Sequence, residues 1–147
     1  MIKIMFVCHG NICRSVMAEY MMKDYCKKHN INDVFIDSAG VSSEEAGNPI
    51  YPPAKRELIK HGITVGNHRA RKLSAQDYDS FDLILCAENC HIKRAESLFG
   101  GDPQCKISLM LDFTDYTGDI ADPWYSGDFS LTFKELYDVC EGLAKIL

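Results

Sequence analysis

The stretch "CHGNICRS", residues 8–15, decides the fold because it joins an apolar run to a helical pattern. The run before it, "IKIMFV" at 2–7, predicts a short strand that is covered on both faces. After Ser15, the residues Met17, Tyr20 and Met21 recur at three- and four-residue spacing, which predicts a helix. A strand that passes through a short loop into a helix is typical of an α/β sheet.

The same alternation continues along the chain. Apolar runs predict further strands over 34–40, 81–87 and 106–113, and periodic segments predict helices over 54–63, 88–101 and 129–147. No internal repeat, low-complexity tract or linker divides the 147 residues. We therefore expect one α/β domain over 1–147, with three layers: a four-stranded parallel sheet and helices on both of its faces.

Composition excludes several classes of protein. A net charge of −5 gives no support for nucleic acid or an anionic membrane as a partner. No stretch approaches the length of a membrane span, and the opening "MIKIMFV" predicts a strand rather than a signal peptide. Seven cysteines, an odd number, predict reduced thiols in the cytoplasm rather than a disulfide framework.

The loop 8–15 carries the first candidate site. In parallel sheets the ligand crevice lies beyond the carboxyl ends of the strands, where this loop is expected. A curled loop before a helix offers unpaired N–H groups to an anion, and Gly10 and Asn11 tolerate the backbone angles of such a curl. Arg14 adds a planar fork that matches two phosphate oxygens. Cys8, held against the same donors, is stabilised as a thiolate and becomes a candidate nucleophile toward phosphorus.

A second motif, "DPWYSGDF" at 122–129, supplies a candidate proton donor. Pro123 favours an extended conformation at Asp122 and so helps to aim its carboxyl group. Trp124 and Tyr125 are suited to form the walls of a slot for a flat substrate group. Taken alone, each motif also has a structural interpretation: a buried cysteine near a chance arginine, and an Asp-Pro turn.

Together the two motifs resemble the low-molecular-weight protein tyrosine phosphatases over nearly the whole chain. "DSAG" at 37–40, "HRARKL" at 68–73 and "FDLILC" at 81–86 also fall in that family's order. The resemblance implies a flavodoxin-like fold of the phosphatase I type. It also implies hydrolysis of protein phosphotyrosine and small aryl phosphates through a cysteinyl-phosphate, with no cofactor and no metal. Cys8 would be the nucleophile, Arg14 would bind the phosphate, and Asp122 would act first as general acid and then as base.

The resemblance assigns supporting roles as well. His9 departs from the family, which usually has an apolar residue or threonine there. Glu44 falls where some members carry an aromatic pocket wall, so that wall would be charged here. The implied phosphate cradle is formed by His9, Gly10, Asn11, Ile12, Cys13, Arg14 and Ser15, its loop-supporting residues are Asn11, Ser15, Ser38 and His68, and the substrate pocket is lined by Ile12, Glu44, Trp124 and Tyr125.

Two relatives on the same fold are alternatives. Arsenate reductases use the same loop with two further cysteines after the third strand, where this chain has Cys86 and Cys90 at a shorter spacing. Protein-arginine phosphatases share the loop but carry threonine where this chain has Ile12, and an apolar side chain offers no hydroxyl to a guanidinium.

Two interpretations from other classes are weaker. A zinc site of Cys86, Cys90, His91 and Cys105 lacks a paired C-x2-C spacing, and we expect Cys86 and Cys105 to lie in the core. A non-catalytic phosphate-binding module would need neither the Cys8 thiol nor the Asp122 carboxyl group.

Partners and redox chemistry follow from the phosphatase interpretation. We expect tyrosine-phosphorylated proteins as partners, a bacterial tyrosine kinase among them, and a chain that is a monomer or weak dimer. Cys13 lies inside the loop, near the predicted nucleophile. An oxidised Cys8 is expected to form a disulfide with Cys13, which cytosolic reductants can reopen.

Overall fold

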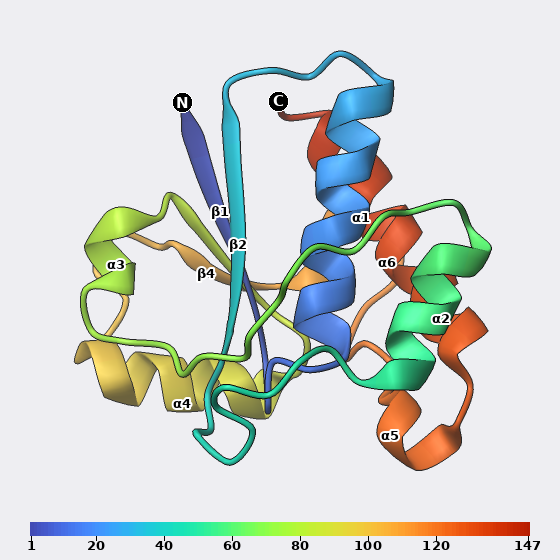
Figure 1. Ribbon diagram of the computed structural model, residues 1–147. Helices are drawn as coiled ribbons and strands as arrows, with labels where there is room; N and C mark the ends of the chain where they lie inside the picture. The colour runs from blue at the N-terminus through green and yellow to red at the C-terminus, as the bar shows by residue number, and fades with distance from the viewer.

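A single parallel sheet forms the centre of the molecule, as the computed structural model of residues 1–147 shows (Figure 1). Its strands are β1 (Ile2–Cys8), β2 (Val34–Gly40), β3 (Leu83–Cys86) and β4 (Ile107–Leu109). They lie side by side in the order β2-β1-β3-β4, which confirms the predicted four-stranded parallel sheet. The order reverses between β1 and β3, so the crevice expected in such sheets opens at the carboxyl ends of these two strands.

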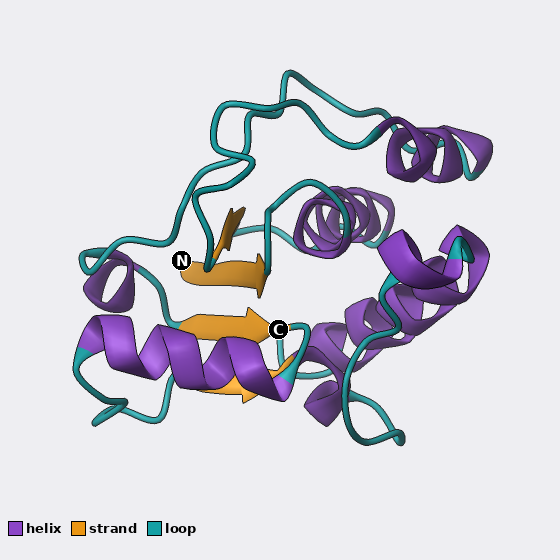
Figure 2. Ribbon diagram, turned by 90° about the horizontal axis from the view of Figure 1, so that it is seen from below, coloured by secondary structure: helices purple, strands orange, loops and turns teal.

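Helices cover both faces of the sheet, and the view in Figure 2 shows them on either side of the strands. The helices α1 (Arg14–Lys28), α2 (Pro52–Lys60) and α6 (Phe129–Ala144) pack together on one face. The short α3 (Asp77–Ser80) and the longer α4 (Asn89–Phe99) lie on the other. This is the predicted three-layer arrangement.

Strand β1 divides its side chains between two cores. Ile4, Phe6 and Cys8 belong to the larger core, under α1, α2 and α6, while Met5 and Val7 belong to the smaller core, under α3 and α4. The division follows from the alternation of side chains along a strand. Cys8 therefore points to the face on which α1 begins.

The predicted strand over 106–113 is wrong in its second half. Strand β4 ends at Leu109, and Met110–Phe113 forms a 3-10 helix, η1. The Asp112 carboxylate accepts a hydrogen bond from the Leu109 N–H at 3.0 Å and so turns the chain. Met110 and Leu111 remain buried, which keeps the sequence apolar beyond the strand. The backbone of α6 comes so close that a Cβ on Gly142 would lie 1.7 Å from the Phe113 carbonyl oxygen.

Other differences lie at element ends. Helix α2 begins at Pro52, earlier than predicted, because proline is well tolerated in the first turn of a helix. Part of the motif at 122–129 forms the short helix α5 (Pro123–Ser126). No helix of the chain is both long enough and apolar enough to cross a bilayer.

Candidate active site

A cavity of about 390 Å³ opens at the carboxyl ends of β1 and β3. Segments that are far apart in the sequence meet there: the loop after β1, the loop after β2, the start of α4, and α5. The predicted residues in its wall are Cys8, His9, Gly10, Ile12, Cys13, Arg14, Glu44, Asp122, Trp124 and Tyr125, and Glu45, Glu88, Cys90 and His91 also line it.

Asn11 holds the loop after β1 in its curled shape. It is fully buried and has a left-handed backbone, with φ of 63°. Its side-chain amide donates to the hydroxyls of Ser15 (2.8 Å) and Ser38 (3.0 Å) and accepts from the Arg71 N–H (3.1 Å). Its carbonyl oxygen accepts from Nε2 of His68 at 2.8 Å. The predicted supporting residues therefore lie behind the loop, where they fix its conformation.

A second layer supports these residues. The Ser38 hydroxyl donates to the buried Glu19 carboxylate at 2.5 Å, and Glu19 in turn pairs with Lys23 at 2.6 Å. The Arg71 guanidinium binds Asp77 at 3.0 Å. Position 40 must be glycine because the loop backbone passes close to it: a Cβ there would lie 2.6 Å from the His9 carbonyl oxygen. The loop is thus tied to both α1 and β2.

The loop presents its backbone donors to the cavity. The N–H groups of residues 9–13 donate no hydrogen bond to the backbone or to a side chain. Cys13 is the N-cap of α1 and has no side-chain capping bond. Because buried N–H groups almost always have partners, a curl of unpaired donors at a helix N-terminus is suited to a tetrahedral oxyanion.

The Cys8 sulfur lies at the base of this curl, and its residue is 3% exposed. Its Sγ is 2.9 Å from the Ser15 hydroxyl oxygen. That oxygen already accepts a hydrogen bond from Asn11, so its own proton is free to donate to the sulfur. A hydrogen bond to the charged form stabilises a thiolate.

Arg14 is buried and held between two carboxylates. Its guanidinium binds Glu88 at 2.7 Å and Asp122 at 3.3 Å, and it also donates to the Ile120 carbonyl oxygen at 3.0 Å. Partial burial opposes ionisation of Glu88, but the Arg14 charge outweighs it and holds the Glu88 pKa below its ordinary value. The other Asp122 oxygen accepts the Trp124 N–H at 3.1 Å, so the aspartate caps α5 while facing Arg14.

Two other groups in the cavity wall remain neutral. Burial raises the pKa of the Cys13 thiol to about 12, with a further contribution from Cys8. Burial, reinforced by the Arg14 charge, lowers the pKa of His91 to about 4. The neutral His91 ring accepts the Glu88 N–H at Nδ1 (3.2 Å) and so caps α4.

The mouth of the cavity has one charged side and one aromatic side. Glu44 lies on the charged side, with its carboxylate 3.4 Å from the His9 Nε2. On the aromatic side, the Trp124 ring packs against Tyr51 with centroids 4.8 Å apart. Tyr125 is 86% exposed, so the mouth is open on this side.

The other cysteines are dispersed. Cys86 is fully buried in β3, as predicted, and burial raises its pKa to about 12. Cys105 is exposed, so its predicted place in the core is wrong. It lies in the turn before β4 with φ of 53°, and pairing of β4 begins only at Ile107. No three His, Cys, Asp or Glu side chains are arranged to hold a metal ion.

Sequence reasoning gave no role to Glu19, Glu45, Arg71 or Glu88, and it named His91 only as a zinc ligand. A signal existed for one pair. Glu88 and His91 directly follow the third predicted strand, at the sheet edge where the site was expected. Glu19 and Arg71 gave no such signal, because they act through Ser38 and Asn11 rather than by facing the cavity.

Comparison with known proteins is consistent across sequence and structure. Residues 3–147 match the family model described as low molecular weight phosphotyrosine protein phosphatase. The chain is 34% identical to the low molecular weight protein-tyrosine-phosphatase YfkJ of Bacillus subtilis, over 97% of this chain and 94% of that one. The crystal structure of YfkJ superposes with a TM-score of 0.93 and covers 99% of this chain and 94% of that one. The structure of a drosophila arginine phosphatase is 31% identical, with a TM-score of 0.89, and covers 99% of this chain and 97% of that one.

The buried neutral His91 predicts a specific dependence of stability on pH. Its pKa is lowered from 6.5 to about 4 in the folded protein, so the unfolded chain binds the proton more tightly. The stability conferred by His91 is therefore complete above about pH 6.5 and is lost as pH falls toward about 4. We expect the wild type to lose on the order of 1–3 kcal/mol more than His91→Gln between pH 7 and 4.5 in urea unfolding. Parallel pH profiles for the two proteins would contradict this assignment.

Proposed function

The chain belongs to the low molecular weight phosphotyrosine protein phosphatase family and is a phosphatase, and we propose that it hydrolyses protein phosphotyrosine through a phosphorylated cysteine. One observation carries the proposal. The Cys8 sulfur, the Arg14 guanidinium and the Asp122 carboxyl group line one cavity, above a loop whose N–H groups have no partner in the protein.

In the first step, the phosphate of the substrate lies in the loop against the N–H groups of residues 9–13 and against Arg14. The Cys8 thiolate attacks phosphorus, and the bond from phosphorus to the tyrosyl oxygen breaks. Asp122, in its acid form, donates its proton to that oxygen, so the leaving group departs as a neutral phenol. Arg14 and the loop N–H groups stabilise the charge on the equatorial oxygens.

In the second step, water attacks the cysteinyl-phosphate. Asp122, now a carboxylate, accepts a proton from that water, and the bond from sulfur to phosphorus breaks. Inorganic phosphate leaves, and Cys8 returns to the thiolate that accepts a hydrogen bond from Ser15. Asp122 thus ends the cycle protonated, ready for the next substrate.

Hydrolysis of phosphoarginine is a second candidate. The cavity mouth carries the carboxylates of Glu44, Glu45 and Asp122, which are suited to a cationic guanidinium. One structural relative is a drosophila arginine phosphatase. Against this candidate, Ile12 presents an apolar surface with no hydroxyl, and Trp124 provides an aromatic wall. An arsenate reductase is disfavoured because Cys86 is fully buried and, unlike Cys8 and Cys13, does not line the cavity.

For partners, we propose tyrosine-phosphorylated proteins, with a bacterial tyrosine kinase among the candidates, and a protein that is a monomer or weak dimer. We propose a cytoplasmic setting, because a thiolate nucleophile requires a reducing compartment. The seven cysteines, all free, are compatible with such a setting.

Removal of the acid tests the roles of Cys8 and Asp122. In Asp122→Ala, kcat should fall by about 10²–10⁴-fold for phenyl phosphate, a poor leaving group, and far less for p-nitrophenyl phosphate. As a control, Asp115→Ala removes an exposed carboxylate from the segment that leads to Asp122, and this variant should retain wild-type rates. In Cys8→Ser, turnover should vanish, but calorimetry should still detect the binding of inorganic phosphate, because the groups that bind phosphate are mainly backbone N–H groups. Equal losses on both aryl phosphates would argue against Asp122 as the acid.

Selectivity tests the choice between the two candidate substrates. The wild type should hydrolyse phosphotyrosine peptides faster than phosphoarginine or phosphoserine peptides, because Ile12 and Trp124 favour an aromatic ring. Ile12→Thr should raise the ratio of kcat/KM for phosphoarginine to that for phosphotyrosine, and Ile12→Val serves as the matched apolar control. A wild type that already prefers phosphoarginine would show that the second candidate is correct.

We further propose that Cys13 protects Cys8 from irreversible oxidation. Peroxide converts the Cys8 thiolate to a sulfenic acid, and the Cys13 thiol attacks that sulfur with loss of water to give a disulfide. Both thiols line the same cavity. The high pKa of Cys13, about 12, leaves the resting thiol protonated, so it does not compete with Cys8 as a nucleophile.

After treatment with peroxide and then dithiothreitol, the wild type should regain activity, whereas Cys13→Ser should not. Cys90→Ser removes the exposed thiol in the same cavity and should recover like the wild type. Equal recovery in Cys13→Ser, or a Cys86–Cys90 disulfide mapped by mass spectrometry, would remove Cys13 from this role.

A further inference from the structure

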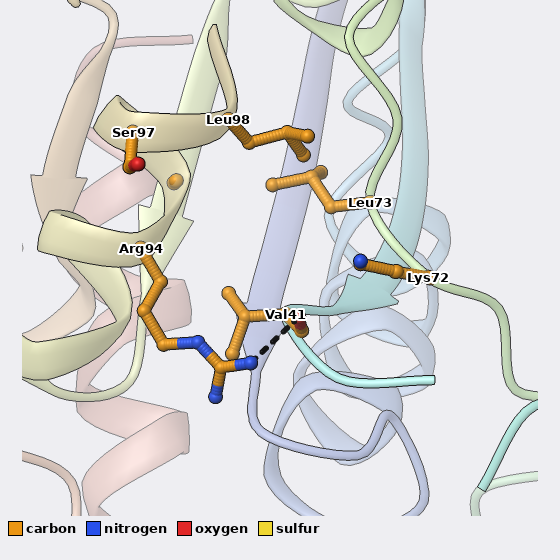
Figure 3. A pocket seen from close by; sticks show the side chains of 7 residues that line it. Val41, Lys72, Leu73, Arg94, Ser97 and Leu98 are labelled. Atoms are coloured by element: carbon orange, nitrogen blue, oxygen red, sulfur yellow. Dashed lines mark hydrogen bonds between the residues drawn. The ribbon is translucent and has the colours of Figure 1, made fainter. Parts of the chain in front are cut away.

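A second cavity, of about 260 Å³, lies beside the catalytic one, between the chain that follows β2 and helix α4 (Figure 3). Its interior is apolar, and in Figure 3 the side chains of Leu73 and Leu98 face each other across it. Lys72 lies next to Leu73 on the same segment, across the cavity from helix α4. The apolar part is formed by Val41, Leu73, Ala95 and Leu98, and the cationic part by Lys72 and Arg94.

The two cavities are neighbours through direct contacts. The Val41 N–H donates to the carbonyl oxygen of the catalytic Cys8 at 3.0 Å. The Arg94 guanidinium donates to the Val41 carbonyl oxygen at 3.2 Å and lies 3.5 Å from Nδ1 of His9. His9 lines the catalytic cavity, so a peptide that leaves this cavity over His9 reaches Arg94 next.

The charges of the two cavities are opposite. Lys72 and Arg94 are exposed, and neither forms an ion pair with a carboxylate. In the catalytic cavity, Glu88 and Asp122 pair with Arg14, while Glu44 and Glu45 add two further carboxylates to the lining. A substrate with an acidic residue near its phosphotyrosine is therefore repelled on the side of Glu44 and Glu45 and attracted on the Arg94 side.

We propose that the second cavity is a substrate subsite that binds an acidic side chain, glutamate above all, close to the phosphotyrosine. The inference rests on the proposed hydrolysis of protein phosphotyrosine. The methylene groups of glutamate would pack on Leu73 and Leu98, and its carboxylate would lie between the Lys72 ammonium and the Arg94 guanidinium. The two cavities are in direct contact and an extended peptide advances about 3.3 Å per residue, so the positions to test are the three on either side of the phosphotyrosine.

The test compares phosphotyrosine peptides that carry glutamate or glutamine at each of these positions. In the wild type, kcat/KM should be about fivefold higher for glutamate at the best position, and the preference should shrink as salt rises from 0.05 to 0.5 M. In the double variant Lys72→Glu, Arg94→Glu, the ratio should fall below one. The ratio within each protein cancels any change in the catalytic steps.

Lys93→Glu makes the same charge change as Arg94→Glu alone, on the same helix, at an exposed position outside the cavity, and should keep the wild-type ratio. Equal rates for glutamate and glutamine peptides in the wild type would overturn the subsite alone. A glutamate preference that survives in the double variant would overturn it as well. Turnover of neither phosphotyrosine peptide would contradict the proposed function itself, and the subsite with it.

Discussion

The buried amide of Asn11 is the constraint on which the active site depends. A left-handed backbone costs most residues roughly 1–2 kcal/mol, and asparagine is one of the few types besides glycine that adopt it. Here it is offset by four hydrogen bonds, to Ser15, Ser38, His68 and Arg71, each contributing about 1 kcal/mol. In this conformation the N–H groups of residues 9–13 have no partner in the protein. The cradle is therefore preorganised, and binding an anion need not order the loop.

Arg14 joins two acidic side chains of the candidate site. One guanidinium meets two carboxylates, Glu88 at 2.7 Å and Asp122 at 3.3 Å. In the proposed reaction, a dianionic phosphate in the loop would add negative charge beside this pair, within reach of the Arg14 guanidinium. Arg14 holds the pKa of Glu88 below its ordinary value, so Glu88 stays ionised beside it.

The sequence predicted the parts of the fold that are local and periodic. Alternation of strands and helices identified the sheet, and loop chemistry located Cys8 and Arg14. It failed at 110–113, where burial kept the sequence apolar although the Asp112 side chain had already ended the strand. It also missed Arg71, which acts on a residue 60 positions away through its backbone N–H and therefore leaves no pattern in side-chain type.

Helix α4 connects the two cavities in a way that no single motif reveals. Its N-terminal turn carries His91, which caps the helix against Glu88 beside Arg14. One and two turns later, at helical spacing, come Arg94 and Leu98 of the second cavity. His91, Arg94 and Leu98 share one face of one helix. The helix therefore fixes the position of Arg94 relative to Glu88 and the Arg14 guanidinium that Glu88 binds. In the proposed complex, a substrate that binds Arg94 contacts a surface whose position is already fixed relative to the phosphate-binding loop. Binding energy gained at Arg94 can therefore help to hold the phosphate in place for reaction.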